Sequence, residues 1–314
     1  MQPHGLVLRR VALSVLLLCS IVAIMVMGST ARADEETAGE LVGGTAARAL
    51  ENELQAEAEA IESRDAKISI YSKYVKVNGV SAEIHDGEVF VPAVAFAEAM
   101  DDCSVSFGSG MLTIEAEGLK FEAKVGDMYV VSNGRYFFVE NGVSIREDGQ
   151  IWLSLTTMAK IFGCEYTLDV ESKSAYLTPT GEYLEDGATY YNAQDLYWLS
   201  RIINAESRGE PFMGQIAVGT VVMNRVKSPI YPNTVHGVVF DGAQFSPAVS
   251  GSVNNAPLEQ CVTVAKIILE GYRLSDKIMY FYAMPANSTY RNGFVNTEEE
   301  IVIGNHYFYT YYKR

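Results

Sequence analysis

The sequence predicts an α+β protein in which a mainly helical domain follows a small duplicated strand-helix-strand domain. Residues 66–180 alternate short apolar runs with Gly, Asn and Asp turns, and this pattern occurs twice. From residue 195 onward, apolar residues recur at helical spacing instead. A length of 314 residues also fits two cores better than one, at about 150 residues for each domain.

The first 33 residues have the pattern of a secretory signal peptide. Arg9 and Arg10 precede an apolar run over residues 11–27, and Ala31 and Ala33 supply small residues at both cleavage-site positions. We therefore expect a secreted chain with no stable membrane insertion once residues 1–33 are removed. The alternative is an uncleaved anchor, because a run of 17 residues is at the lower limit for a membrane span.

Residues 34–65 are predicted to be an acidic spacer rich in Ala and Glu. They hold ten acids, two arginines and no aromatic residue, a composition that buries too little apolar surface to offset chain entropy. The acidity continues to residue 194, with 29 Asp or Glu against 11 Lys or Arg over residues 34–194. Because so negative a chain repels polyanions, neither nucleic acid nor an anionic membrane is expected as a partner.

The duplication in residues 66–180 has an offset of 61 to 63 positions. Two short motifs, residues 78–81 and 89–91, recur at residues 141–144 and 151–153. A helical stretch and a second strand pair follow each copy. Two cysteines, Cys103 and Cys164, occupy equivalent places. One hypothesis is a disulfide between the copies, and the other is two small buried residues.

This front region resembles the copper amine oxidase N-terminal-like domain found on secreted bacterial proteins. Copper chemistry is not expected, because His85 is the only histidine in residues 66–180 and a copper site needs several. The resemblance implies, by analogy, that residues 66–180 attach the protein to the wall or space it from the wall.

In the second half, one carboxylate falls on the apolar face of a predicted helix. Asp195 is the expected cap, and Gly209 and Pro211 are expected to end the helix just beyond Glu206. The stripe that Glu206 continues comprises Leu196, Leu199 and Ile203. Desolvation and the helix C-terminus both raise a carboxyl pKa, so Glu206 is predicted to be a general acid. The alternative is an ordinary glutamate that bonds nearby backbone or faces solvent.

Three sequence motifs of the second half resemble those of the SleB-type spore-cortex-lytic and cell-wall hydrolase family. They are residues 204–211 (NAESRGEP), residues 214–226 (GQIAVGTVVMNRV) and residues 231–245 (YPNTVHGVVFDGAQF). The resemblance implies a lysozyme-like catalytic domain over residues 190–314, acting as a lytic transglycosylase on peptidoglycan with Glu206 as acid and base. The alternatives are a hydrolytic muramidase or glucosaminidase, a cell-wall amidase, and a non-catalytic wall-binding protein.

Five further residues are expected to bind substrate. Thr220 shares a predicted helix face with Asn224, and the resemblance is compatible with Thr220 facing the cleft, although ordinary packing is an equal alternative. Aromatic side chains suit a sugar groove, which favours two tyrosines of the aromatic C-terminal part. Residues 283–285 differ from the motif that follows the aromatic cluster in the family. The sequence therefore leaves open which tyrosine corresponds to the one that the resemblance implies is essential. The candidates are Thr220, Gln244, Phe245, Tyr280 and Tyr282.

No metal or other cofactor is expected. Only His236 and His306 lie in the second half, with no ligand pair of the H-E-x-x-H kind, which disfavours a zinc amidase. Cys261 sits among apolar helix neighbours, which disfavours a cysteine peptidase. The nearby acids are expected to be structural, with Glu210 capping the next helix and Asp241 in a turn.

Overall fold

The computed structural model describes residues 67–72, 75–85, 87–169, 171–242, 244–283 and 300–310, which belong to one compact unit beginning at Ser63. The predicted signal peptide (residues 1–33) and spacer (34–65) lie outside the described residues. Within the described part of the chain, no helix is long and apolar enough to cross a membrane.

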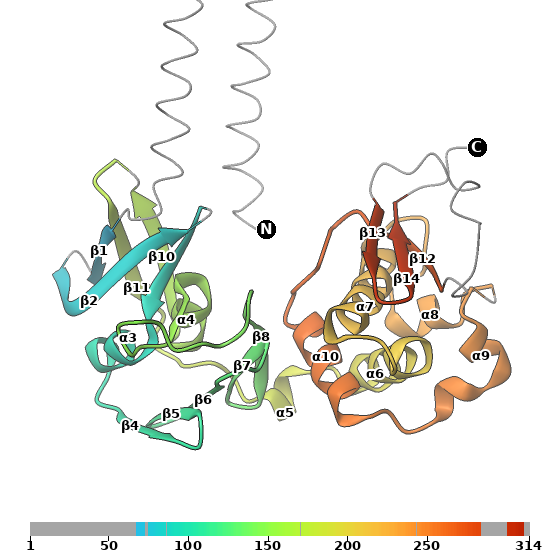
Figure 1. Ribbon diagram of the computed structural model, residues 1–314, viewed down its shortest axis with the longest axis horizontal. Helices are drawn as coiled ribbons and strands as arrows, with labels where there is room; N and C mark the ends of the chain where they lie inside the picture. The colour runs from blue at the N-terminus through green and yellow to red at the C-terminus, as the bar shows by residue number, and fades with distance from the viewer. Residues whose placement is uncertain are drawn as a thin grey trace, which may run out of the picture. The chain divides into compact units, whose positions relative to one another are not determined.

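The front region contains a six-stranded sheet with two short helices on it (Figure 1). Alternate residues of its strands are buried, because one face packs on the helices, and Ile70, Val91 and Leu177 are among them. The strands, in sheet order, are β10 (Cys164–Asp169), β11 (Ser174–Pro179), β1 (Lys67–Ser72), β2 (Val75–His85), β3 (Glu88–Pro92) and β9 (Trp152–Ser154). The helices are α3 (Ala93–Met100) and α4 (Leu155–Ile161).

The duplication predicted from the sequence appears as a local two-fold relationship. β3 and β9 occupy equivalent places in the two copies and pair antiparallel, with Val91 opposite its own equivalent, Leu153. Each strand then leads into its own helix, α3 or α4. Equivalent positions that pair with each other indicate that an approximate two-fold axis passes between these strands.

Beyond the helices, the two copies diverge. The strand pair of the second copy, β10 and β11, joins the six-stranded sheet, and β1 extends that sheet by pairing parallel with β11. The pair of the first copy begins a separate antiparallel sheet of five strands in chain order. These are β4 (Ser104–Gly108), β5 (Met111–Ala116), β6 (Leu119–Lys124), β7 (Tyr129–Ser132) and β8 (Arg135–Phe138). Cys103 and Cys164 are free thiols, which contradicts the disulfide hypothesis.

The second half is mainly helical, as predicted. Its core lies between α6, α7 and α10, which pack on one another in pairs, and α8 packs against α6 and α7 (Figure 1). The helices are α5 (Gly187–Tyr190), α6 (Ala193–Ser207), α7 (Phe212–Lys227), α8 (Val235–Val239), α9 (Ser246–Ser250), the 3-10 helix η1 (Ser252–Asn254) and α10 (Glu259–Leu269). Asn192, three residues before the predicted cap Asp195, caps α6 by accepting the N–H groups of Gln194 and Asp195.

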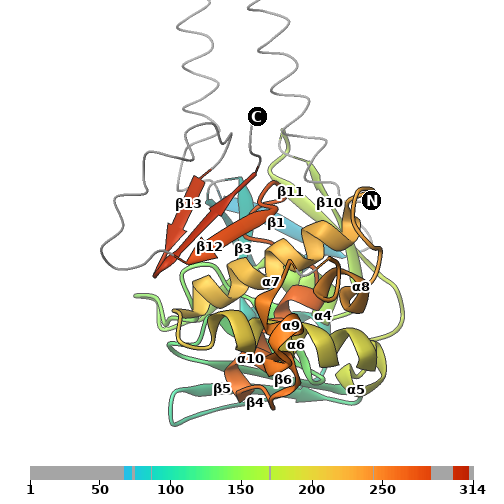
Figure 2. The same ribbon diagram turned by 90° about the vertical axis from the view of Figure 1, so that its right-hand side faces the viewer.

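A three-stranded sheet, in the order β12-β14-β13, completes this half and lies beside α7 (Figure 2). Its strands are β12 (Tyr280–Ala283), β13 (Glu300–Ile303) and β14 (His306–Tyr309). Phe308 is fully buried and packs in the helical core, so one face of the sheet closes that core. An α+β fold with a mainly helical second half is thereby confirmed.

The β7–β8 hairpin contributes to the core of the helical half. Phe138 stacks on Tyr272 with ring centroids 3.9 Å apart. Next to this contact, the Arg135 guanidinium donates to both carboxylate oxygens of Glu270, at 2.7 and 2.8 Å. Although burial by itself raises the pKa of Glu270, the Arg135 hydrogen bonds and the nearby charges hold it below its ordinary value. Contacts of this kind couple the stability of the helical half to the hairpin.

Candidate active site

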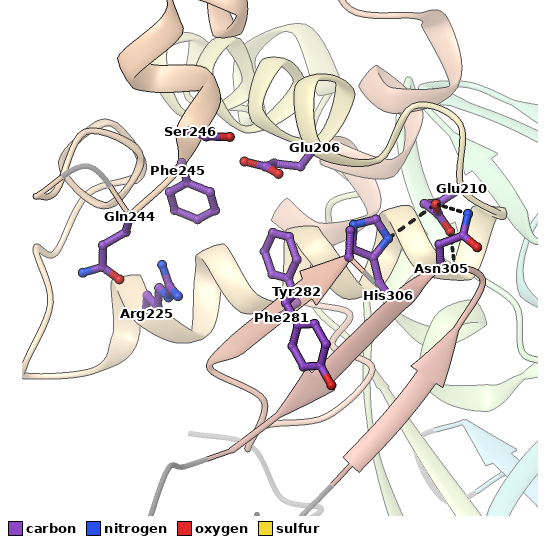
Figure 3. Close-up of a pocket in the computed structure, with 11 residues that line it drawn as sticks. Glu206, Glu210, Arg225, Gln244, Phe245, Ser246, Phe281, Tyr282, Asn305 and His306 are labelled. Carbon is purple, nitrogen blue, oxygen red and sulfur yellow. Dashed lines mark hydrogen bonds and ion pairs between the residues drawn. The ribbon is translucent and has the colours of Figure 1, made fainter. Parts of the chain in front are cut away.

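Glu206 lies in the last turn of α6 and lines an open pocket of about 690 Å³. Figure 3 shows its carboxylate directed into this pocket, toward Phe245 and Ser246. No hydrogen bond or ion pair reaches the Glu206 carboxylate from the residues that the structure describes. Burial raises the pKa of Glu206 from 4.5 to about 7, so a large fraction of this carboxyl group keeps its proton near neutral pH.

The pocket wall combines aromatic faces with a few polar groups. Phe245 is buried and approaches Phe281 across the pocket, with ring centroids 6.3 Å apart. Apolar walls of this kind disfavour the charged form of a carboxyl group, and burial raises the pKa of Glu206 in the same direction. The lining residues are Glu206, Glu210, Arg225, Gln244, Phe245, Ser246, Phe281, Tyr282, Ala283, Asn305 and His306.

Glu210 lines the same pocket but is held by other groups. Its Oε2 accepts the backbone N–H of Asn305 at 2.9 Å, and its Oε1 lies 3.5 Å from Nδ1 of His306 (Figure 3). The prediction that Glu210 caps the next helix is wrong, because α7 begins after Pro211 with no side-chain cap. Glu210 instead ties the start of α7 to the turn between β13 and β14. Asp241 behaves as predicted for a turn residue and accepts from the Gln244 side chain.

Two of the predicted substrate-binding residues, Gln244 and Phe245, do line the pocket. They lie between α8 and α9, where Phe245 is buried and Gln244 is exposed. This segment forms the wall opposite β12, so its side chains can contact a molecule that also contacts Glu206.

The two predicted tyrosines of β12 do not face Glu206 directly. Tyr282 borders the pocket, but its ring stacks on Tyr307 and its hydroxyl points away from Glu206 (Figure 3). Tyr280 is absent from the lining and its hydroxyl bonds that of Tyr231. Because strand side chains alternate between faces, the residue between them, Phe281, is the one directed into the pocket. Of the two predicted tyrosines, Tyr282 is therefore in the pocket lining and Tyr280 is not, and a role of Tyr282 in substrate binding stays a prediction.

Thr220 is also misplaced by the sequence-based prediction. Its side chain is fully buried, and its Oγ1 accepts the backbone N–H of Leu274 at 3.2 Å. Asn224, on the same helix face, donates to the carbonyl groups of Ser275 and Ile278. This face of α7 therefore holds the loop before β12 in place rather than lining a cleft. The packing alternative for Thr220 is the correct one.

Arg225 is a site residue that the sequence analysis missed. It is buried, its Nε donates to the Met279 carbonyl at 2.8 Å, and its guanidinium lies 5.1 Å from the Phe245 ring centroid. His306 was considered only as a metal ligand. It lines the pocket beside Phe281, with ring centroids 5.6 Å apart. Neither role has a local sequence signal, since both depend on chain segments that are distant in sequence.

Rival catalytic groups have little support in the described part of the chain. No group of three or more His, Cys, Asp or Glu side chains there is arranged to hold a metal ion. Cys261 is fully buried in α10, and burial raises the pKa of its thiol to about 11. A thiol with so high a pKa is a poor nucleophile at neutral pH.

The geometry defines a small helical domain with one half-buried carboxylic acid, without a partner among the described residues, in a pocket that has aromatic walls. Residues 209–309 match the family model of the cell wall hydrolases, and residues 69–177 match that of the copper amine oxidase N-terminal domain. Both resemblances inferred from the sequence are confirmed: the chain joins a cell wall hydrolase domain to a copper amine oxidase N-terminal domain. The first match begins three residues after Glu206, so it does not itself assign the role of that residue.

Among curated proteins, this chain is similar to spore cortex-lytic enzymes. Identity to the enzyme from Bacillus cereus is 33% over 92 residues, which is 29% of this chain and 36% of that protein. Identity to the enzyme from Oceanobacillus iheyensis is 30% over 119 residues, 38% of this chain and 42% of that protein. The chain thus spans less than half the length of these relatives.

A similar solved structure is the catalytic domain of the germination-specific lytic transglycosylase SleB from Bacillus anthracis. Identity is 30%, and the similarity covers 39% of this chain and 98% of that domain, with a TM-score of 0.34.

Proposed function

We propose that this chain is a peptidoglycan lytic transglycosylase that cuts the glycan backbone between MurNAc and GlcNAc, with Glu206 as its acid and base. The observation that carries the proposal is the Glu206 carboxyl group, which lines an open pocket, has a pKa raised to about 7 and has no partner among the described residues. An acid of this kind can donate a proton to a leaving oxygen at neutral pH. The names of the similar proteins support the same substrate class.

The proposed reaction needs a single carboxyl group. Glu206 gives its proton to the glycosidic oxygen as the bond from that oxygen to the anomeric carbon of MurNAc breaks. The 6-hydroxyl of the same MurNAc then bonds to this carbon, and its proton passes to the Glu206 carboxylate. Glu206 ends in its starting form, no water is consumed, and the product carries a 1,6-anhydro-muramic end.

The partners of Glu210 favour this reaction over hydrolysis. A hydrolytic muramidase or glucosaminidase needs a second carboxylate as nucleophile or base. Glu210 is the other carboxylate in the pocket lining, and its oxygens are engaged by Asn305 and lie near His306. A carboxylate held by these contacts is less free to reach a water molecule beside the sugar.

Mass spectrometry of a peptidoglycan digest tests the proposal. Fragments with 1,6-anhydro ends are expected. Reducing ends would instead assign a hydrolytic muramidase or glucosaminidase, and freed stem peptides an amidase. Intact peptidoglycan after prolonged incubation would leave the protein as a wall-binding one. Digests of vegetative wall and of spore cortex, run in parallel, identify the preferred substrate.

We further propose that residues 1–33 direct export, that the protein acts at the cell wall or spore cortex, and that residues 66–180 contribute wall attachment. Two observations motivate the layout: the signal-like start of the sequence and the match of residues 69–177 to a separate family model. N-terminal sequencing of protein recovered from culture medium tests export, with Asp34 the expected first residue. A start at Met1 would refute cleavage.

A further inference from the structure

A second group of aromatic side chains lies on the surface of the helical half, outside the pocket lining. Tyr197 and Trp198 belong to α6, His236 to α8, and Phe240 follows α8 directly. Tyr197 is 44% exposed and Phe240 40% exposed. His236 is exposed as well, and Trp198 is partly buried against the core beneath. We call these four residues the aromatic platform.

The rings of the aromatic platform hold one another in place. Trp198 meets His236 and Phe240 edge-on, with ring centroids 5.3 and 5.0 Å apart. On the other side of the platform, Tyr197 meets Trp198 at 4.8 Å, and the Arg201 guanidinium lies 3.6 Å from the Tyr197 ring centroid. Side chains fixed in this way lose little conformational freedom on binding, which favours a binding surface.

The aromatic platform and the Glu206 pocket share two chain segments. Trp198 and Glu206 are on the same helix, eight positions apart, which corresponds to about 12 Å along the helix axis. Phe240 begins the segment that continues to Gln244 and Phe245 in the pocket wall. α8 packs against α6, so the two segments that carry the platform are neighbours.

A contiguous group of exposed aromatic rings offers apolar surface to a ligand. A pyranose ring has an apolar face of C–H groups and a polar rim, which matches an aromatic ring with polar neighbours. A glycan strand is linear, so any strand held at Glu206 must leave the pocket over the adjacent surface. A protein partner is disfavoured, because four side chains are far fewer than the roughly 20–30 residues that each side of a stable protein interface contributes.

We propose that the aromatic platform is a distal sugar-binding site, which stacks a pyranose ring of the same glycan strand that Glu206 cuts. This inference rests on the proposed function, because it takes peptidoglycan glycan as the ligand. The platform holds long strands in register with the pocket and contributes nothing to a fragment too short to reach it.

Binding to purified insoluble peptidoglycan tests the platform without cleavage. In a Glu206→Gln background, the double substitution Tyr197→Ala and Phe240→Ala is expected to weaken binding about tenfold. Tyr197→Ala by itself, which leaves the contact of Phe240 with Trp198 intact, is expected to show part of this loss. The control is Phe107→Ala in β4, which removes a 55% exposed ring elsewhere and is expected to bind normally. Melting temperatures confirm that the variants are folded.

In the active enzyme, the same double substitution is expected to lower cleavage of long strands about tenfold and leave a short soluble fragment unaffected. Unchanged binding and cleavage would overturn the platform and leave the proposed function standing. An equal loss in Phe107→Ala, or a lower molar mass of the double variant in light scattering, would also overturn it. If the unsubstituted enzyme cleaves no glycan, the proposed function fails, and the binding comparison still tests the platform.

Discussion

Glu206 and Glu210 line the same pocket four residues apart, yet only Glu210 has partners among the described residues. Glu210 accepts the backbone N–H of Asn305, at 2.9 Å, whereas burial without a partner raises the pKa of Glu206 to about 7. The difference arises because Glu206 ends α6 inside the pocket, while Glu210 follows the turn and meets the β13–β14 connection. Two carboxyl groups of one short segment therefore have different chemistry.

Substitution of the two glutamates by glutamine is expected to separate their roles. Glu206→Gln keeps the shape of the side chain but has no acidic proton, so cleavage should fall by about 10²-fold to 10⁴-fold or more. Glu210→Gln retains an oxygen that can accept the Asn305 N–H, and most activity should remain. Release of soluble fragments from peptidoglycan measures both variants. A Glu206→Gln enzyme with normal activity would move the acid to another residue.

The rate of cleavage is expected to depend on the protonation of Glu206. Because the proton donor is the neutral acid and its pKa is about 7, kcat/KM should be constant at lower pH and fall about tenfold per pH unit above the pKa. A pH series on one soluble glycan fragment gives the curve. A rate that rises steadily from pH 6 to 9 would show that the ionised form is the active one.

Glu206 should also affect stability, and with a definite sign. The folded protein holds the Glu206 proton up to a pKa of about 7, whereas the ordinary value is 4.5. The stability associated with the neutral carboxyl group is present in full below pH 4.5 and is lost as the pH rises to 7. Relative to wild type, Glu206→Gln should therefore gain up to about 3 kcal/mol of unfolding free energy across this window. Urea unfolding at pH 4.5 and pH 8 measures the gain, and equal differences at both would contradict the raised pKa.

Phe281, rather than Tyr282, is expected to shape the pocket. Phe281→Ala removes the ring that faces Phe245 and admits water, so activity should fall and the pKa seen in the pH profile should move down toward 4.5. The matched substitution Tyr282→Phe keeps the ring and removes a hydroxyl group that points away from Glu206, so kcat/KM should stay within about twofold. Steady-state kinetics distinguish the two. A large loss in Tyr282→Phe would restore that tyrosine as the substrate-binding residue.

Thr220→Val is expected to affect folding and not substrate binding. The substitution keeps the shape of the side chain but leaves the half-buried Leu274 N–H without its acceptor, which costs about 1 kcal/mol of unfolding free energy. KM should be unchanged, because Thr220 does not line the pocket. Denaturant unfolding and kinetics check both statements. A raised KM at unchanged stability would return Thr220 to the cleft.

The contact between Arg135 and Glu270 is expected to make the helical half depend on the front hairpin. Both side chains are almost fully buried, so Arg135→Met removes two hydrogen bonds from the buried carboxylate and leaves it only Lys160 and Tyr191 as partners, which should cost about 3 kcal/mol. Lys160→Met is the control, since Lys160 bonds the same carboxylate from a 41% exposed position and should cost less than about 1 kcal/mol. Chemical denaturation of the full chain measures both. Equal costs would show that the ion pair stabilises little.

The position of Glu206 on its helix was determined by the sequence itself. Helical periodicity places it on the apolar stripe, and Gly209 and Pro211 end the helix just beyond it, all within one short segment. The duplication in residues 66–180 could also be predicted from the sequence, because repeated motifs are recognised without knowledge of tertiary contacts. Signals of this kind are local, and local geometry is what sequence patterns report.

Tertiary structure alone decided which face of β12 meets Glu206. Tyr-Phe-Tyr has no alternation of apolar and polar residues, so its sequence cannot say which side chain turns inward, and pairing with β14 settles it. The partners of Glu210 and Arg135 are 95 and 135 residues away in the chain. Such contacts depend on how distant segments pack, and no spacing of residues encodes them.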